Sequence, residues 1–236
     1  MRVRKKYWAE NELQTNDLIL ENGAENKGKW KHIFANENPV FVEIGCGKGG
    51  FIAETARRNP NINFIGLERE KMVIVSGARQ IRELSENGEE IGNVRFLCFD
   101  AANLSDIFDE GEIGRIYLNF SDPWHRRKKW AKRRLTHRNF LKNYKALLSG
   151  NKEIHMKTDN RILFEFSLNE FAAMGWGLKN ISLDLHNSGF AKENVVTEYE
   201  AKFSAKGMPI FRLEASFPNG PAISEYEKYT DSFKQN

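Results

Sequence analysis

Residues 43–50 read EIGCGKGG, and this run constrains the fold more than any other part of the chain. The hydrophobic residues 39–42 lead into it, and residues 51–56 continue with the apolar spacing of a helix. This order predicts a strand, a tight glycine turn and the opening of a helix. Glycines are needed where the backbone takes a positive φ and comes close to a ligand. We therefore expect a nucleotide-like cofactor at the carboxyl end of this strand, beside the helix N-terminus.

Two acidic residues narrow the choice of cofactor. Gly45, Gly47 and Gly50 fit G-x-G-x-x-G, a pattern that also marks NAD enzymes and is weak by itself. Glu43 stands just before the first glycine, where an anion suits a cationic ligand better than a pyrophosphate. Glu68 follows the turn by about 20 residues, the spacing of an acid that accepts hydrogen bonds from ribose hydroxyls. S-Adenosylmethionine carries a ribose and a sulfonium but no phosphate, so we predict it as the cofactor. The simpler alternative is an ordinary βαβ turn with two exposed acids.

The positive charge of the chain is concentrated in one segment. The net charge is +4, from 36 Lys and Arg against 32 Asp and Glu. Residues 125–138, HRRKKWAKRRLTHR, contain eight of these Lys and Arg and no acid, which leaves 28 basic against 32 acidic residues elsewhere. A local basic block favours a polyanionic partner. A solvated helix face is the alternative for an isolated run of charge.

Strands and helices alternate along most of the sequence. Strand candidates lie at residues 39–44, 63–68, 94–99, 114–120 and 152–157, and helical spacing is found at 49–58, 70–86, 140–148 and 161–174. Residues 210–217 alternate with period two, as an antiparallel strand at a sheet edge would. The pattern predicts an α/β fold with a doubly wound, Rossmann-like, mostly parallel sheet and an antiparallel C-terminal edge strand.

In such a sheet, ligands bind where the strands end. The predicted strand ends place a row of carboxylates on one rim: Glu43, Glu68, Asp100, Asp122 and Asp159. We expect the early strands to serve the cofactor and the later ones the substrate. We divide the chain into a basic and polar N-terminal arm at residues 1–38, a domain at 39–220 and a C-terminal tail at 221–236.

A second motif, Ser121-Asp-Pro-Trp124, follows the fourth predicted strand. Proline fixes the backbone, so the turn is rigid and Asp122 is presented at the rim. A carboxylate accepts hydrogen bonds from purine N–H groups, and the ring of Trp124 offers a face on which a splayed base can stack. A strand end with a half-buried Trp is the alternative, which the basic block just after the motif disfavours.

Seven motifs in order give the chain a specific resemblance. They are EIGCGKGG, FIGLE, FDA, FSDPW, RRL, KTD and TEYE, and the match covers residues 39–217. Together they resemble the bacterial tRNA guanine-N7 methyltransferase family. The resemblance implies that residues 39–220 form a class I S-adenosylmethionine-dependent methyltransferase domain. It also implies methylation of a guanine in the variable loop of tRNA.

The resemblance and the glycine turn together suggest roles for individual residues. The cofactor positions are Glu43, Gly45, Gly47, Glu68, Asp100 and Asp122, of which Asp122 is also the catalytic position. The substrate positions are Arg126, Asp159, Thr197, Glu198, Tyr199 and Glu200. The family commonly has a proline and then lysines after FSDPW, whereas His125 and Arg126 stand here. Because a guanidinium favours bidentate contact with phosphate, we predict that Arg126 contacts phosphate rather than a base.

The methyl transfer that the resemblance implies needs no general base. Guanine N7 has an in-plane lone pair and no proton, so methyl transfer needs alignment and desolvation rather than a general base. We expect Asp122 to anchor the base and stabilise the positive charge that develops on the purine. Two other classes stay open: methyltransferases of exocyclic amines, which usually show two prolines in this motif, and a non-catalytic RNA-binding domain on a similar scaffold.

The remaining residues suggest no further chemistry. Cys46 and Cys98 form no metal pattern and no disulfide framework, which suggests a reducing cytoplasm, and the five histidines lack metal-ligand spacing. No apolar run approaches the length of a membrane span. We expect tRNA as the partner, no metal, no membrane and no obligate protein partner, and the sequence leaves homo-oligomerisation open.

Overall fold

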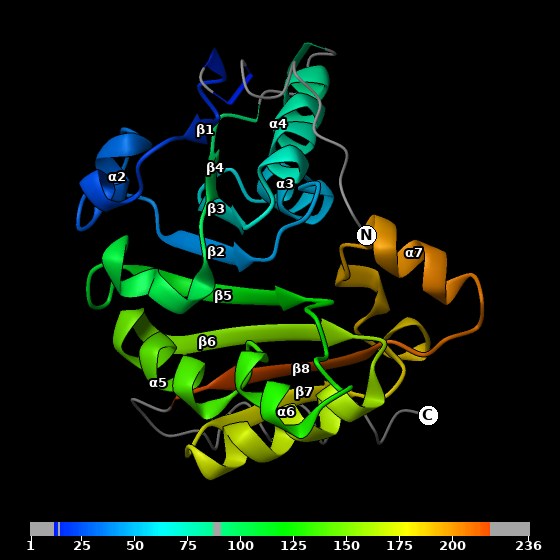
Figure 1. The fold of residues 1–236 in the computed structure, drawn as a ribbon. Helices are drawn as coiled ribbons and strands as arrows, with labels where there is room; N and C mark the ends of the chain where they lie inside the picture. Colours follow the sequence, from blue (N-terminus) through cyan, green and yellow to red (C-terminus); the bar gives the residue numbers. More distant parts are fainter. Residues whose placement is uncertain (1–11, 14, 87–90, 218–236) are drawn as a thin grey trace.

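The computed structural model describes residues 12, 13, 15–86 and 91–217, and they build a sheet with helices on both faces (Figure 1). The strands are β1 (Ile19–Leu20), β2 (Val40–Ile44), β3 (Asn63–Glu68), β4 (Val94–Cys98), β5 (Ile113–Asn119), β6 (Leu148–Thr158), β7 (Gly177–Ser182) and β8 (Phe211–Ser216). Their spatial order is β1-β4-β3-β2-β5-β6-β8-β7. The pairs from β1 to β6 are parallel, and β8 is antiparallel to both of its neighbours. The predicted α/β, mostly parallel architecture is therefore confirmed.

Successive strand residues point to opposite sides of the sheet, and both sides carry apolar residues. Helices therefore cover both faces. They are α2 (Trp30–Ile33), α3 (Gly50–Arg58), α4 (Lys71–Glu86), α5 (Arg138–Leu147), α6 (Arg161–Ala173) and α7 (Glu198–Ser204). On β2, Val40, Val42 and Ile44 face the core under α5 and α6. Phe41, between them, packs with the second core, under α3 and α4. The sheet is thus doubly wound, as the alternating pattern predicted.

Residues before β2 contribute to this core. Strand β1 pairs in parallel with β4. Trp30 is fully buried, its Nε1 donates a hydrogen bond to the carbonyl oxygen of Ile107 at 2.8 Å, and its ring lies 5.3 Å from that of Phe108. The domain boundary at residue 38 stays a prediction, and the predicted tail at 221–236 lies outside the described residues.

The C-terminal strand β8 pairs antiparallel, as predicted. It lies second from the edge, because β7 covers its other side. The sequence pattern did not predict β7. Its register shifts between Lys179 and Ser182, and Asn180 has a positive φ of 51°, so the strand lacks a clean two-residue alternation.

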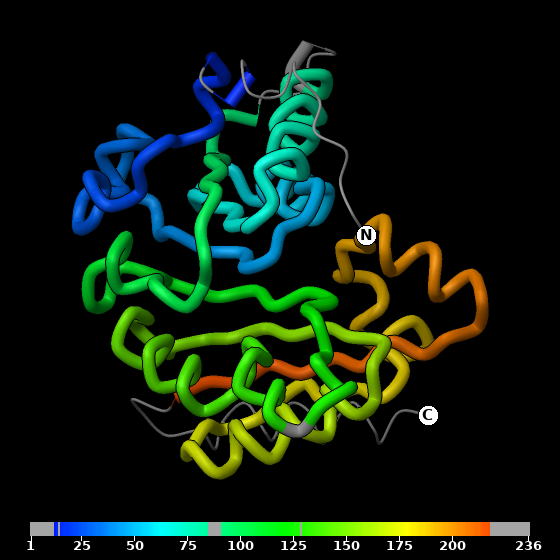
Figure 2. Tube along the Cα trace, in the orientation of Figure 1, coloured from blue at the N-terminus to red at the C-terminus, as the bar shows by residue number. Residues whose placement is uncertain are grey.

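The rim formed by the carboxyl ends of the parallel strands is where the predicted site residues lie. Glu43 is the second-last residue of β2 and Glu68 the last of β3, while Asp100, Asp122 and Asp159 follow β4, β5 and β6. The chain trace in Figure 2 brings the orange segment of α7 to this rim. Among the described residues, no helix combines the length and apolarity of a transmembrane span.

Candidate active site

The glycine turn after β2 is held by main-chain hydrogen bonds to β3. The N–H groups of Gly45 and Cys46 both donate to the carbonyl oxygen of Leu67, at 2.7 and 3.0 Å. Gly45 and Gly47 have positive φ values of 78° and 56°, and a Cβ built on either would meet no atom within 4 Å. The turn therefore leaves open space where a ligand can approach the backbone. Gly49, with φ of 76°, is the third left-handed position, whereas Gly50 is the first residue of α3.

Glu68 is oriented by three main-chain donors. Its Oε2 accepts a hydrogen bond from the N–H of Gly47 at 3.2 Å, and its Oε1 accepts from those of Arg69 and Glu70 at 2.7 and 3.1 Å. The carboxylate is thus fixed beside the glycine turn and stays partly exposed. Carboxylate oxygens have further acceptor capacity, so this geometry is compatible with binding of hydroxyl groups.

Glu43 is the most unusual carboxyl group at the rim. It is 2% exposed, and its Oε1 accepts a hydrogen bond from Nδ2 of Asn119 at 2.9 Å. Its Oε2 has no hydrogen-bond partner among the described residues. Burial raises the pKa of Glu43 to about 8, although Asn119 and the Lys157 ammonium act in the opposite direction. A buried carboxyl oxygen without a partner fits a positively charged ligand that donates to it.

Asp100 lies farther along the rim and organises its own turn. Its Oδ1 accepts a hydrogen bond from the N–H of Ala102 at 2.9 Å, which caps the 3-10 turn Ala101–Asp106. The side chain is exposed. Asp100 is therefore held in place and open to a ligand.

The loop after β5 carries Asp122 between two strained residues. Phe120 and Trp124 have positive φ values of 51° and 42°, which are uncommon for residues other than glycine. The N–H of Phe120 donates to the carbonyl oxygen of Lys157 at 2.8 Å, and Nε of Arg134 donates to that of Pro123, also at 2.8 Å. Asp122 is exposed at the apex of a loop that is bound at both ends. Such strain often accompanies functional loops.

Asp122, Asp159 and Tyr199 come together at this end of the sheet. Oη of Tyr199 lies 3.5 Å from Oδ2 of Asp159, the outer limit of a hydrogen bond. Partial burial raises the pKa of Tyr199, and the charges of Asp159 and Asp122 raise it further. The Tyr199 ring lies 5.1 Å from that of Phe120 and 4.3 Å from that of Phe203. Two carboxylates thus flank a stack of aromatic rings.

The four predicted substrate positions at the start of α7, where Thr197 is the N-cap, differ in exposure. Thr197 and Glu200 form a capping box, and the Glu200 side chain is fully buried. Tyr199 is 45% exposed, and Glu198 is exposed and forms an ion pair with Lys48 of the glycine turn at 3.5 Å. Glu198 and Tyr199 are therefore open to solvent, while Thr197 and Glu200 hold the helix in place.

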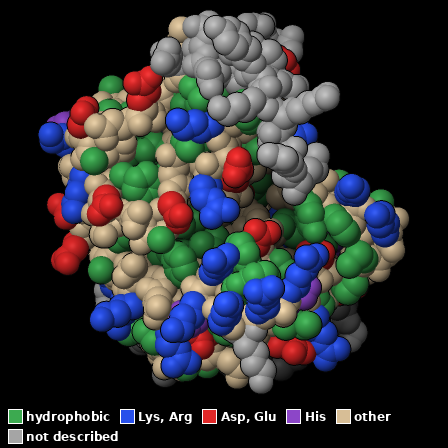
Figure 3. All heavy atoms as spheres, viewed as in Figure 1, with side chains coloured by type: hydrophobic (Ala, Val, Ile, Leu, Met, Phe, Trp, Pro, Cys, Tyr) green, Lys and Arg blue, Asp and Glu red, His purple; other side chains and the backbone are tan. Residues whose placement is uncertain are grey.

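The basic block packs against the Asp122 loop. The guanidinium of Arg133 lies 5.0 Å from the centre of the Trp124 ring, and Trp130 meets Trp124 edge-on at 5.9 Å. Trp124 therefore links the block to the loop rather than offering both of its faces to a base. Arg126, Arg127, Lys129, Lys132 and Arg133 are exposed. Figure 3 shows Lys and Arg side chains gathered on the lower half of this face of the molecule.

Comparison with known proteins identifies the family. A sequence model described as "Putative methyltransferase" matches residues 37–213. The tRNA (guanine-N(7)-)-methyltransferase of Bacillus subtilis is 48% identical over 218 residues, which are 92% of this chain and 99% of the relative. That of Geobacillus is 49% identical over 219 residues, with 92% and 96% coverage. The chain belongs to the tRNA (guanine-N7-)-methyltransferase family. The resemblance that the seven motifs indicated is confirmed.

Solved structures agree on the fold of this methyltransferase. The 16S rRNA methyltransferase KamB superposes with a TM-score of 0.60 at 13% identity, over 80% of this chain and 93% of KamB. An antibiotic-related methyltransferase gives 0.56 at 19% identity, over 80% and 92%. At such low identity these matches show the shared Rossmann-like fold alone.

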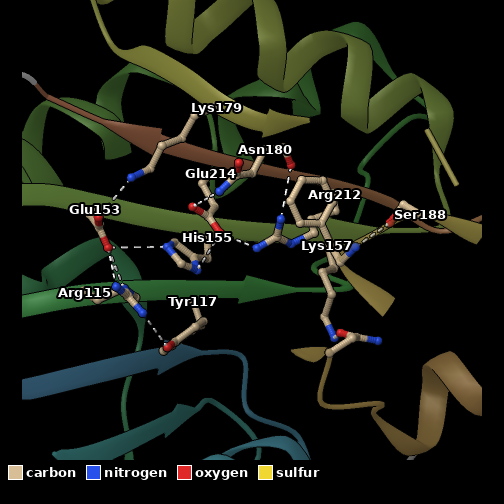
Figure 4. Close-up of polar contacts among 12 residues, drawn as sticks. Arg115, Tyr117, Glu153, His155, Lys157, Lys179, Asn180, Ser188, Arg212 and Glu214 are labelled. Atoms are coloured by element: carbon tan, nitrogen blue, oxygen red, sulfur yellow. Dashed lines mark hydrogen bonds and ion pairs between the residues drawn. The ribbon is translucent and has the colours of Figure 1, made fainter. Parts of the chain in front are cut away.

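A groove of about 440 Å³ lies on the α3 side of the sheet, behind the rim of the methyltransferase. Its floor consists of charged side chains of β5, β6, β7 and β8, most of which are paired with one another (Figure 4). Arg115 donates to Glu153 through Nε at 2.9 Å, Lys179 lies 3.6 Å from Glu153, and Asn180 donates to Glu214 at 2.9 Å. The neighbouring His155 imidazole, 3.5 Å away, and the charge of Arg115 lower the pKa of Glu153 to about 2, against the effect of burial. The groove shares only Asn119 and Lys157 with the site described above.

Three residues beside the predicted site were given no role by the sequence: Asn119 and Gly77 lie outside the seven motifs, and Lys157 is the first residue of KTD, of which only Asp159 was assigned. Asn119 hydrogen-bonds Glu43, and Lys157 lies behind the Asp122 loop. Gly77 of α4 lets that helix approach the glycine turn, since a Cβ there would lie 2.8 Å from the carbonyl oxygen of Lys48. For Gly77 the available signal was a glycine inside an otherwise helical pattern, which often marks close packing.

Proposed function

We propose that the rim is the active site and that this enzyme transfers a methyl group from S-adenosylmethionine to N7 of a guanine in the variable loop of tRNA. Family membership carries the reaction class. One structural observation supports the assignment of the site. The exposed carboxylate of Asp122 and the half-buried carboxylate of Asp159 flank Tyr199, beside a glycine turn that follows the buried, half-satisfied carboxyl group of Glu43.

The residues of the glycine-turn half suit the cofactor. Glu43, Gly45, Gly47, Glu68 and Asp100 would hold it, with Asp122 at the boundary to the substrate. The open space over Gly45 and Gly47 and the unpartnered oxygen of Glu43 support this assignment. When bound, S-adenosylmethionine supplies a methyl group on a positively charged sulfur. The protein would supply a fixed carboxylate at Glu68 and a carboxyl group at Glu43 that is shielded from water.

The residues of the rim near Tyr199 suit a guanine base of tRNA. Asp159 and Tyr199 would orient the base, with Glu198 beside them and Thr197 and Glu200 fixing their helix. Arg126 and the exposed members of the basic block would contact phosphates. Because N7 carries no proton, the carboxylate of Asp122 has no proton to remove, and its role is to stabilise the positive charge that develops on the purine.

The cellular setting follows from the substrate. We place the enzyme in the cytoplasm, where it would meet free tRNA, and require no protein partner for activity.

Incubation of the purified protein with methyl-labelled cofactor and total tRNA, followed by nucleoside analysis, tests the proposal. We expect 7-methylguanosine as the labelled product. A transcript with 7-deazaguanosine in the variable loop lacks the accepting nitrogen, and we expect it to stay unlabelled while a matched unmodified transcript reacts. Label in an exocyclic amine would refute the N7 assignment, and label outside the variable loop would refute the position.

A further inference from the structure

The helix α7 is attached to the domain in an unusual way. Its exposed residues include Glu198 and Tyr199, which face the site, and the one residue of α7 that is buried is the acidic Glu200. Short helices are normally held by an apolar face, because a helix of this length is unstable alone. Here a buried carboxylate takes that place.

Lys157 of β6 is the buried cation that meets this carboxylate, and Nε2 of His186 lies 3.0 Å from its other oxygen, Oε1. It is 6% exposed, and its Nζ donates to Oε2 of Glu200 at 2.7 Å. The same Nζ donates to Oδ1 of Asn194 at 2.9 Å and to the carbonyl oxygen of Val195 at 2.8 Å. All three donors of the ammonium are therefore used by the segment 194–200, which leads into α7. In Figure 4 the Lys157 side chain extends away from the paired charges of the groove.

The other polar contacts of α7 with the domain are exposed or long, apart from that of His186 with Glu200, which is an ion pair only when the imidazole is protonated. The Lys48–Glu198 pair is exposed at both ends, and exposed pairs contribute little. The Tyr199–Asp159 contact is at the limit of a hydrogen bond. Asn194, which also donates to Glu200 at 2.6 Å, is itself one of the acceptors of Lys157. Loss of one member of a buried ion pair leaves an uncompensated charge, which a short surface helix avoids by moving away.

Lys157 also contacts the other parts of the site. Its carbonyl oxygen accepts the hydrogen bond from Phe120 that fixes the Asp122 loop. Its ammonium lies 5.2 Å from the centre of the Phe51 ring on α3 and acts on the buried carboxyl group of Glu43. One residue therefore joins α7, the Asp122 loop and the cofactor half.

We propose that Lys157 is a positioning residue: its ammonium holds α7, through Glu200, in the place where Tyr199 and Glu198 can meet the guanine. This proposal rests on the proposed function, since the positioned residues are those we assign to the substrate. It predicts that the charge of Lys157 is needed for turnover of tRNA although Lys157 itself does not contact the substrate.

Hydrogen exchange of the free protein gives the first test, in Lys157→Met. We expect peptides covering residues 194–204 to exchange faster than in the wild type, while those of β2 to β5 keep their protection. We expect kcat/KM for tRNA to fall by tenfold to about a hundredfold, the scale of a misplaced contact group. Cofactor affinity should change much less. Lys179→Met, which removes a lysine of the same groove that pairs with Glu153, is the matched control and should leave all three readouts unchanged.

A second variant separates positioning from stability. In Lys157→Met/Glu200→Leu no charge is left buried, so we expect the melting temperature to recover toward the wild-type value. We expect the activity on tRNA to stay low. Recovery of activity together with stability would overturn the proposal, and so would unchanged exchange of residues 194–204 in Lys157→Met. If that single variant does not fold, Glu200→Gln breaks the same pair from the other side and must give the same exchange pattern. Failure of the wild type to methylate tRNA would refute the proposed function instead, because the exchange measurement needs no substrate.

Discussion

Nε of Arg134 donates a hydrogen bond to the carbonyl oxygen of Pro123 at 2.8 Å, so one arginine of the basic block belongs to the turn that presents Asp122. Arg134 is 8% exposed, and its guanidinium lies 4.3 Å from the centre of the Phe166 ring. Arg138 is likewise engaged, with Glu170. The block therefore contains two kinds of cation: those that hold the structure and those that face solvent.

The exposed cations should determine the salt dependence of tRNA binding. We expect the combined change of Arg126, Lys129 and Lys132 to Ala to reduce the slope of log affinity against log salt by about 2 to 3, since each lost phosphate contact removes about 0.7 to 0.9. The Michaelis constant for tRNA should rise, and cofactor affinity should not change. Arg134→Ala is the control. It should lower kcat by disturbing the Asp122 turn, and it should change the slope by no more than about 0.9, the value for one phosphate contact. An unchanged slope in the triple variant would mean that the block is only a solvated surface.

Asp122 should control the rate rather than binding. Asp122→Asn keeps the shape of the side chain and removes its charge. If that charge stabilises the cationic purine, single-turnover methyl transfer at saturating tRNA and cofactor should slow by about a hundredfold or more, as when other charge-stabilising contacts are removed. Affinity for tRNA and cofactor should change much less, because the interaction strengthens only as charge develops. A rate within a few-fold of wild type would reduce Asp122 to a packing residue.

The sequence predicted the parts of the site that depend on strand order. Parallel strands place their carboxyl ends on one rim, so Glu43, Glu68 and Asp159 could be assigned to the same edge from the alternation of strands and helices alone. The glycine turn was predictable for a similar reason, because its residues are adjacent in the chain. The glycine that takes the left-handed position before α3 was not predictable, since the motif marks Gly50 whereas Gly49 takes that position.

Contacts between distant segments were not predictable. Nothing in the run of arginines distinguishes Arg134, whose partner is a main-chain oxygen in the preceding loop, from its exposed neighbour Arg133. Glu200 belongs to a motif that suggested substrate contact, and only the fold shows that its carboxylate meets Lys157, 43 residues earlier. Such long-range pairs leave no local pattern in a single sequence.

The approach of α4 to the glycine turn should be necessary for cofactor binding. In Gly77→Ala the new Cβ would lie 2.8 Å from the carbonyl oxygen of Lys48, so the helix or the turn must move. We expect cofactor affinity to fall by about tenfold, which corresponds to the low end of the cost of overpacking. The substitution also improves helix propensity, so a gain in thermal stability would not contradict the prediction. Gly92→Ala, where a Cβ meets nothing within 4 Å, is the control. Unchanged cofactor affinity in Gly77→Ala would show that the turn tolerates the shift.

The buried carboxyl group of Glu43 should make cofactor binding release a proton. Its pKa of about 8, raised from 4.5 mainly by burial, means that the ligand-free enzyme holds a proton there at neutral pH. The folded state thus binds this proton more tightly than the unfolded chain, so the associated stability is complete below about pH 4.5 and is lost as the pH rises through 8. A positively charged cofactor favours the ionised form, and its affinity should therefore increase with pH up to about 8.

Calorimetric titration at neutral pH in two buffers of different ionisation enthalpy measures the released protons. We expect release approaching one proton per cofactor, and an affinity that rises by up to about tenfold per pH unit below the pKa. Glu43→Gln is the matched control, because it keeps the hydrogen-bonding shape and cannot ionise. The difference between the two proteins isolates Glu43 from the titration of the cofactor's own amino group. Equal proton release in both proteins would show that Glu43 does not lose a proton when the cofactor binds. The proposal that burial prepares its unpartnered oxygen to accept a cation would then be refuted.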